Sequence, residues 1–158
     1  MQRYIKVLNY FTFYGARNDK ENYIKTYREN EKVIDEMWNN TLDAKLEAVL
    51  HTAIYFVFTE QYEKAIEYYD YMIDFQNQAA EIDSNLAVTD ELLNIRNNDL
   101  AELYCKIGNM EKAAEYFKKA KKFFSDTDVP FFRSELERVG KILAEAGVDY
   151  SCSDNKEE

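Results

Sequence analysis

The chain has 158 residues, the length of about one domain. It contains 13 tyrosines and 10 phenylalanines but only four glycines and one proline, too few turn-forming residues for a protein built from many strands. The formal net charge of −10 disfavours general binding to nucleic acid, because an acidic surface repels phosphate groups. Composition therefore predicts an all-α protein.

Targeting and membrane segments are not expected. Residues 1–11 lack the continuous apolar stretch and the small-residue cleavage site of a secretion signal. The longest apolar stretch without a formal charge covers residues 48–59, far short of the roughly 20 residues that a membrane-spanning helix needs. We therefore expect a cytoplasmic protein with no membrane partner.

Hydrophobic periodicity predicts about seven helices. The first ends before Gly15, and the next covers about 19–38. The others run from the turn at 39–41 to about 58, then over about 61–82, 87–107, 110–124 and 130–146. Gly108 and Asn109 carry stop and start signals, because glycine suits a left-handed C-cap and asparagine an N-cap. Short loops between these helices predict antiparallel neighbours.

Small residues and aromatic rings recur at a fixed spacing over residues 94–127. They are Leu100, Ala101, Tyr104, Gly108, Ala113, Phe117 and Ala120. With this spacing, the stretch resembles a tetratricopeptide repeat. The small residues would let two helices approach closely, and the rings would fill the space beside them. The pattern departs at Asn97 and Ser125, where a large residue and a proline are usual.

A second copy of the pattern covers about 46–79, with Glu60 in place of the turn glycine, and a weaker third copy covers about 4–37. The resemblance implies antiparallel helix hairpins stacked as a short superhelix, with the last helix as a cap. A closed helical bundle is the alternative. We expect one repeat domain over 1–147 and a polar, disordered tail over 148–158.

Catalytic and cofactor sites are not expected. The only histidine is His51, and Glu47 lies four residues before it, but a di-iron site of this kind needs a second histidine. The cysteines Cys105 and Cys152 form no metal-binding motif, and the four glycines are scattered. We predict no metal, no cofactor and no enzyme activity. His51 is interpreted as a packed or hydrogen-bonded residue, and Cys105 as a buried, inert thiol.

The resemblance implies a concave groove that is lined by the first helix of each repeat and binds a peptide or helix. Its expected peptide-binding positions are Glu47, Leu50, Ile54, Val57, Phe58, Ile95, Asn98, Glu102 and Lys106. Leu50 and Ile54 stand where family members that bind a C-terminal carboxylate have lysine and asparagine, so that subtype is disfavoured. The alternative is that Leu50, Ile54 and Val57 only pack against the amino-terminal helices.

These positions predict a non-catalytic protein–protein interaction module, an adaptor or a chaperone-like protein. The groove is apolar in its first half and polar to acidic in its second. Its partner would be a protein or peptide segment with apolar anchors and basic residues. Self-association, as a homodimer or another structural oligomer, is the second hypothesis, and an enzyme is the third.

Overall fold

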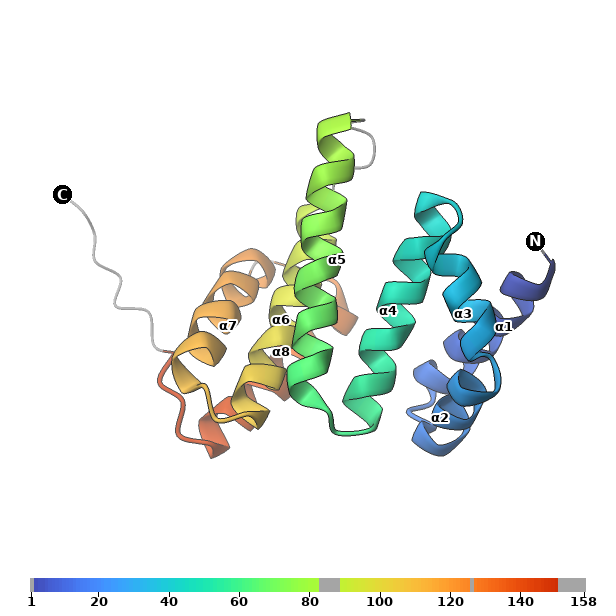
Figure 1. Ribbon diagram of the computed structural model, residues 1–158. Coiled ribbons are helices and arrows are strands. Elements are labelled where there is room, and N and C mark those ends of the chain that lie inside the picture. The colour runs from blue at the N-terminus through green and yellow to red at the C-terminus, as the bar shows by residue number, and fades with distance from the viewer. Residues whose placement is uncertain (1, 83–88, 126, 151–158) are drawn as a thin grey trace. The chain divides into compact units, whose positions relative to one another are not determined.

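The computed structural model describes residues 2–82, 89–125 and 127–150. Over these residues it contains eight helices and no strand, which confirms the all-α class (Figure 1). The helices are α1 (Gln2–Ala16), α2 (Lys20–Glu29), α3 (Glu31–Trp38), α4 (Leu42–Phe58), α5 (Tyr62–Ile82), α6 (Asp90–Lys106), α7 (Met110–Phe124) and α8 (Pro130–Glu145). None of the helices in the described ranges combines the length and apolarity needed to cross a membrane.

The helix predicted over 19–38 is two helices, α2 and α3, which meet at Asn30. The Asn30 side-chain amide donates to the Thr26 carbonyl at 2.8 Å, and its backbone N–H donates to the Tyr27 carbonyl at 3.1 Å. Asparagine side chains compete in this way with the regular backbone hydrogen bonds of a helix. The prediction of one continuous helix was therefore wrong, which accounts for the eighth helix.

The chain divides into two compact units, residues 1–75 and residues 76–158. We call them unit 1 and unit 2. Helix α5 belongs to unit 1 up to Phe75 and to unit 2 from Gln76. The single repeat domain expected over 1–147 stays a prediction.

Unit 1 has a core in which buried rings are combined with hydrogen-bonded polar side chains. Tyr23 is fully buried, and its hydroxyl shares a 2.8 Å hydrogen bond with Nδ1 of His51. The ring of Phe11 stacks on that of His51, with 4.6 Å between centroids. The Tyr27 hydroxyl and the Thr52 hydroxyl are 2.9 Å apart. These contacts join α1 and α2 to α4, and they confirm His51 as a packed, hydrogen-bonded residue.

The first part of α5 completes unit 1 through aromatic contacts. The Tyr68 ring lies 6.0 Å from Trp38 of α3 and 5.3 Å from Phe56 of α4. Lys45 lies over the Phe75 ring, with its Nζ atom 4.3 Å from the centroid. Such cation–π contacts stabilise surface positions modestly. Within unit 1, α5 therefore packs on the α3 and α4 side (Figure 1).

Unit 2 is built around the α6–α7 hairpin, and α8 packs against both of its helices. Ala101 of α6 and Ala113 and Ala120 of α7 are fully buried. Their small side chains allow the close helix approach that the sequence pattern predicted. The Tyr150 hydroxyl donates to the Gly140 carbonyl at 3.2 Å, so the first residues of the predicted tail contact α8. Residues 151–158 of that tail lie outside the described residues.

One type of turn follows α1, α4, α6 and α8. The turn residues have positive φ angles: Asn18 (50°), Glu60 (59°), Gly108 (78°) and Gly147 (76°). In each turn, the N–H of the next residue donates at 2.9 Å to the carbonyl five residues before it. This is the bonding pattern of a Schellman C-cap, which satisfies carbonyl groups at a helix end. Glu60 thus adopts the backbone conformation that glycine supplies at position 108.

Candidate functional site

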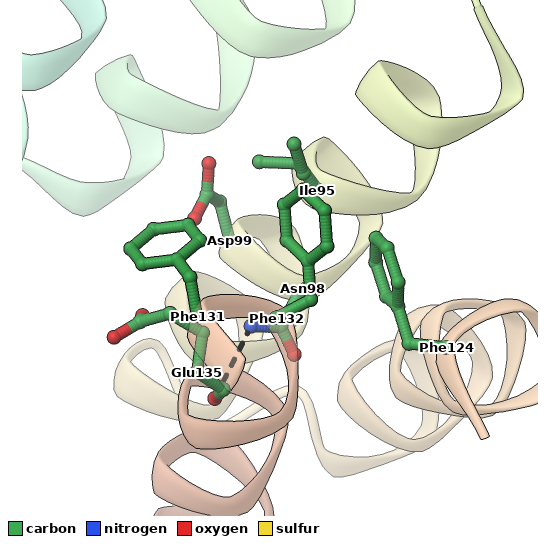
Figure 2. Close-up of a pocket in the computed structure, with 7 residues that line it drawn as sticks. All are labelled: Ile95, Asn98, Asp99, Phe124, Phe131, Phe132 and Glu135. Atoms are coloured by element: carbon green, nitrogen blue, oxygen red, sulfur yellow. Dashed lines mark hydrogen bonds between the residues drawn. The ribbon is translucent and has the colours of Figure 1, made fainter. Parts of the chain in front are cut away.

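Unit 2 contains a small pocket between α6 and the first turns of α8. Its volume is about 60 Å³, and its lining combines aromatic and aliphatic side chains with three polar ones (Figure 2). The lining residues are Ile95, Asn98, Asp99, Phe124, Phe131, Phe132 and Glu135. An apolar pocket with a few polar groups is the usual form of a ligand or anchor site.

The aromatic part of the pocket is built where α7 ends and α8 begins. The Phe124 and Phe132 rings stack with 4.8 Å between centroids, and Phe131 lies edge-on to Phe132 at 5.5 Å. Pro130 begins α8, a position that suits its fixed φ angle and missing N–H. Phe131 follows it and is 63% exposed. The rim of the pocket therefore presents a large apolar ring to solvent.

Asn98 forms the polar floor of this region. It is 5% exposed, and its side-chain amide donates to the Glu135 backbone carbonyl at 3.5 Å. Its Oδ1 atom is buried and has no hydrogen-bond partner among the described residues. A buried acceptor without a hydrogen-bond partner costs free energy, so this oxygen lowers the stability of the folded protein.

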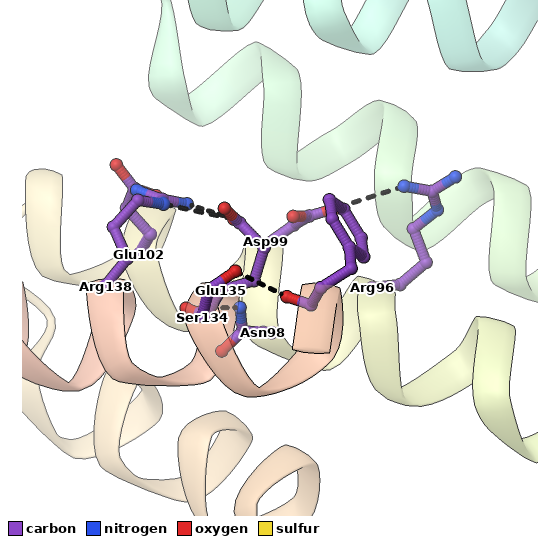
Figure 3. A network of polar contacts seen from close by, with 8 residues as sticks. Arg96, Asn98, Asp99, Glu102, Ser134, Glu135 and Arg138 are labelled. Atoms are coloured by element: carbon purple, nitrogen blue, oxygen red, sulfur yellow. Dashed lines mark hydrogen bonds and ion pairs between the residues drawn. The ribbon is translucent and has the colours of Figure 1, made fainter. Parts of the chain in front are cut away.

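Charged side chains of α6 and α8 form a network beside the pocket (Figure 3). Arg138 of α8 lies between two carboxylates, 2.8 Å from Glu102 and 3.0 Å from Glu135. Arg96 lies 3.0 Å from the Asp99 carboxylate. Three carboxylates thus meet two guanidinium groups, and the carboxylates are in excess.

Two side chains of this network, Asp99 and Arg138, have shifted pKa values. Burial raises the pKa of the Asp99 carboxyl above its ordinary value, although the Arg96 guanidinium opposes the shift. Burial alone would lower the pKa of Arg138, but its hydrogen bonds and ion pairs with Glu135 and Glu102 outweigh burial and raise it. The Arg138 guanidinium therefore keeps its charge between its two carboxylate partners.

The groove positions predicted on α6 contribute to this site to different degrees. Ile95 and Asn98 line the pocket, and Glu102 lies next to it in the ion pair with Arg138. Lys106 is exposed one helical turn beyond Glu102. Two of these positions therefore belong to the pocket itself, and a third belongs to the charged network beside it.

The groove positions predicted on α4 lie in unit 1. Ile54 and Phe58 are half-buried and pack against the core, with Phe58 edge-on to Tyr23 at 4.9 Å. Leu50 and Val57 are half-buried, and Glu47 is exposed, 3.4 Å from Nε2 of His51. At least Ile54 and Phe58 thus serve the packing of unit 1.

Several pocket residues were missed in the sequence: Asp99, Phe124, Phe131, Phe132 and Glu135. Most of them lie at the end of α7 or on α8, outside the helix that was predicted to be the first of a repeat. The signal that could have found them is Pro130, because a proline that opens a helix places the two following rings at its first turn.

The cysteines and the metal-ligating side chains are the other candidate groups. Cys105 is buried, and burial raises the pKa of its thiol, as expected for an inert cysteine. Cys152 lies outside the described residues. Within the described ranges, no group of three or more His, Cys, Asp or Glu side chains is placed to hold a metal ion.

Comparison of the chain with models of known protein families, with curated proteins and with solved structures found no match.

Proposed function

We propose that this protein is a tetratricopeptide-like helical-repeat protein with a non-catalytic role as an adaptor or chaperone-like module. Its unit 2 pocket would bind a segment of another protein. The recurring Schellman turns, the alanine-lined α6–α7 hairpin and the packing of α8 against both helices support the repeat interpretation. In a repeat protein, similar helix hairpins stack one after another, and these features are expected of such a stack.

The pocket carries the functional proposal. An apolar hollow of about 60 Å³ would accept the end of one aliphatic side chain, and the exposed Phe131 ring would cover it. The excess of carboxylates beside the pocket favours a basic residue on the same segment. The partner is therefore an extended or helical segment that carries one apolar anchor next to a lysine or arginine.

Selection of random 12-residue peptides displayed on phage, with the full chain as bait, tests this proposal. We expect enrichment of peptides that combine an aliphatic residue with a nearby lysine or arginine. The best peptide, made synthetically and labelled, would then be titrated against Phe131→Glu. Because this change removes an exposed ring and adds a negative charge at the apolar rim, we expect its affinity to fall at least about tenfold.

Phe123→Glu is the matched control. Phe123 is 42% exposed in the same unit but does not line the pocket, so this variant should bind like the unmodified protein. Absence of any enriched peptide, or equal weakening by the two variants, would overturn the proposal. Circular dichroism of both variants separates loss of binding from loss of helical structure.

A further inference from the structure

Helix α1 presents a basic and aromatic face to solvent. Tyr10 is 42% exposed and Phe13 is 49% exposed, while Lys6 and Arg17 are exposed beside them. Residues 6, 10 and 13 follow the three- and four-residue spacing that places side chains on one helix face, and Arg17 lies in the turn directly after α1. We call these four residues the basic stripe. The buried residues Val7 and Phe11 point the other way, into the core.

The cations of the basic stripe are held against its rings. The Arg17 guanidinium lies 3.7 Å from the centroid of Phe13, and Lys6 Nζ lies 5.9 Å from that of Tyr10. Over the described part of the chain, neither Lys6 nor Arg17 takes part in an ion pair. Helix α1 also contains no acidic residue, in a chain whose net charge is −10. This face is thus suited to an acidic surface with some apolar character.

The same unit carries such a surface on α5. Glu63, Glu67 and Asp74 are exposed and share one helix face, with the 39%-exposed Tyr71 ring beside them. We call these four residues the acidic stripe. Its three carboxylates form no ion pair with any other described residue. The buried side of this helix segment carries Ala65.

The two stripes match in length. Lys6 and Arg17 are separated by 11 positions, and so are Glu63 and Asp74. With a rise of about 1.5 Å per residue, Glu63 and Asp74 are spaced about 16 Å apart along α5, and Lys6 and the turn residue Arg17 span a similar number of positions along α1 and its end. Within unit 1, α3 and α4 lie between α1 and the first part of α5, so these two helix segments are separated within one copy (Figure 1).

We propose that the basic stripe of one copy binds the acidic stripe of a second copy. This contact is head-to-tail, because different surfaces of the two copies meet. Each added copy leaves one free stripe of each sign, so association continues into a ring or an open chain. The contact is salt-sensitive, since exposed ion pairs are screened and each contributes little by itself.

Charge reversal tests the proposal directly. The first variant is Lys6→Glu with Arg17→Glu, which makes both stripes acidic. The second is Glu63→Lys with Asp74→Lys, which makes both basic. Sedimentation velocity over a range of concentrations, at about 50 mM salt, should show association of the unmodified protein. Each variant alone should associate at least about tenfold more weakly, and an equimolar mixture of the two should associate again.

The mixture is the decisive sample because both variants keep a negative net charge, so only matched stripes can restore the contact. Lys121→Glu with Lys122→Glu is the control, since it changes the net charge as the first variant does but lies in unit 2. It should associate like the unmodified protein. The association experiment does not involve the unit 2 pocket. A negative result would therefore overturn the proposed self-association without affecting the proposed peptide binding, and the reverse also holds.

Three results would overturn the proposal. One is an unmodified protein that stays monomeric at about 50 mM salt. Another is a mixture that associates no better than its components. The third is a monomer whose basic stripe instead binds vesicles of phosphatidylserine and phosphatidylcholine, with binding lost in the first variant, which would assign the stripe to a membrane surface.

Discussion

The two units hold their helices together in different ways. Unit 1 uses large rings and buried hydrogen-bonding side chains, with Phe11 stacked on His51 and the Tyr23 hydroxyl bonded to the same histidine. Unit 2 places fully buried alanines where α6 and α7 meet, Ala101 and Ala113 among them. Its conspicuous polar contacts are charged and lie between α6 and α8.

In both units, the same type of turn joins consecutive helices, after α1 and α4 in unit 1 and after α6 in unit 2. A position at a close contact between two helices accepts few residue types, because almost any side chain larger than alanine would clash there. A core of rings has more ways to fill its volume, so its residue pattern varies more. The comparison therefore teaches that a helix pair which packs through small side chains leaves a stricter pattern in the sequence than a pair which packs through large rings.

The largest expected effect comes from breaking the ring cluster of unit 1. Phe11→Ala removes a side chain that is 1% exposed and should lower the free energy of unfolding by about 3–5 kcal/mol. Trp38 is the only tryptophan and lies in unit 1, so its fluorescence in a urea titration reports this unit. Phe13→Ala, at a half-exposed ring of the same helix, is the control and should cost less than about 1 kcal/mol. Equal losses would show that the buried cluster is not what stabilises unit 1.

Exchanging the turn residues sharpens the comparison between the two units. Gly108 has a φ of 78° and open space where a Cβ atom would lie, so Gly108→Ala should lower stability by about 1 kcal/mol through backbone strain alone. Glu60 already bears such strain at a φ of 59°. Glu60→Gly should raise the free energy of unfolding by less than about 1 kcal/mol. Relief of the strain is partly offset because glycine makes the unfolded chain more flexible, which favours unfolding by about 0.4–1 kcal/mol. Urea titrations of both variants check this, and shifts of the same sign would contradict it.

The smallest expected effect is a pH dependence confined to unit 2. The raised pKa of Asp99 means that the folded protein holds this proton more tightly than the unfolded chain does. Its contribution to stability therefore falls as pH rises from the ordinary carboxyl pKa, about 4, through the raised value. The stability of the unmodified protein relative to Asp99→Asn should therefore fall as pH rises above about 4 toward neutral.

Tyr27→Phe is the control from unit 1. Burial raises the pKa of Tyr27 to about 12, so this change should leave the pH slope over the same range unaltered. A stability difference for Asp99→Asn that stays constant or grows with pH would contradict the account.

Much of the helical framework could be predicted from periodicity and capping signals. The α6–α7 hairpin follows from the small residues, and its turn follows from Gly108 and Asn109. The break at Asn30 could not be placed, because the flanking segments share one apolar period and the asparagine breaks the helix through a side-chain bond to the Thr26 carbonyl. Glu60 was expected in the place of a turn glycine and does lie in such a turn, but its residue type alone does not report its positive φ.

The site was predicted only in part. Ile95 and Asn98 were expected to face a ligand because of their register on the first helix of a repeat, and they line the pocket. The rings of Phe131 and Phe132 come from the helix that was expected to be a cap. Their contribution depends on how α8 packs against α6 and α7, which residue spacing along one helix does not specify.

The most direct test of the proposed function is to map peptide binding on the isotope-labelled protein by nuclear magnetic resonance. The probe is the synthetic peptide obtained from the phage selection, added stepwise while backbone amide shifts are followed. The account predicts that the largest changes occur at Ile95, Phe131 and Glu135 and that amides around Leu50 and Val57 in unit 1 change little. Changes centred on Leu50 and Val57, or no localised change at saturating peptide, would contradict the assignment of the unit 2 pocket as the binding site.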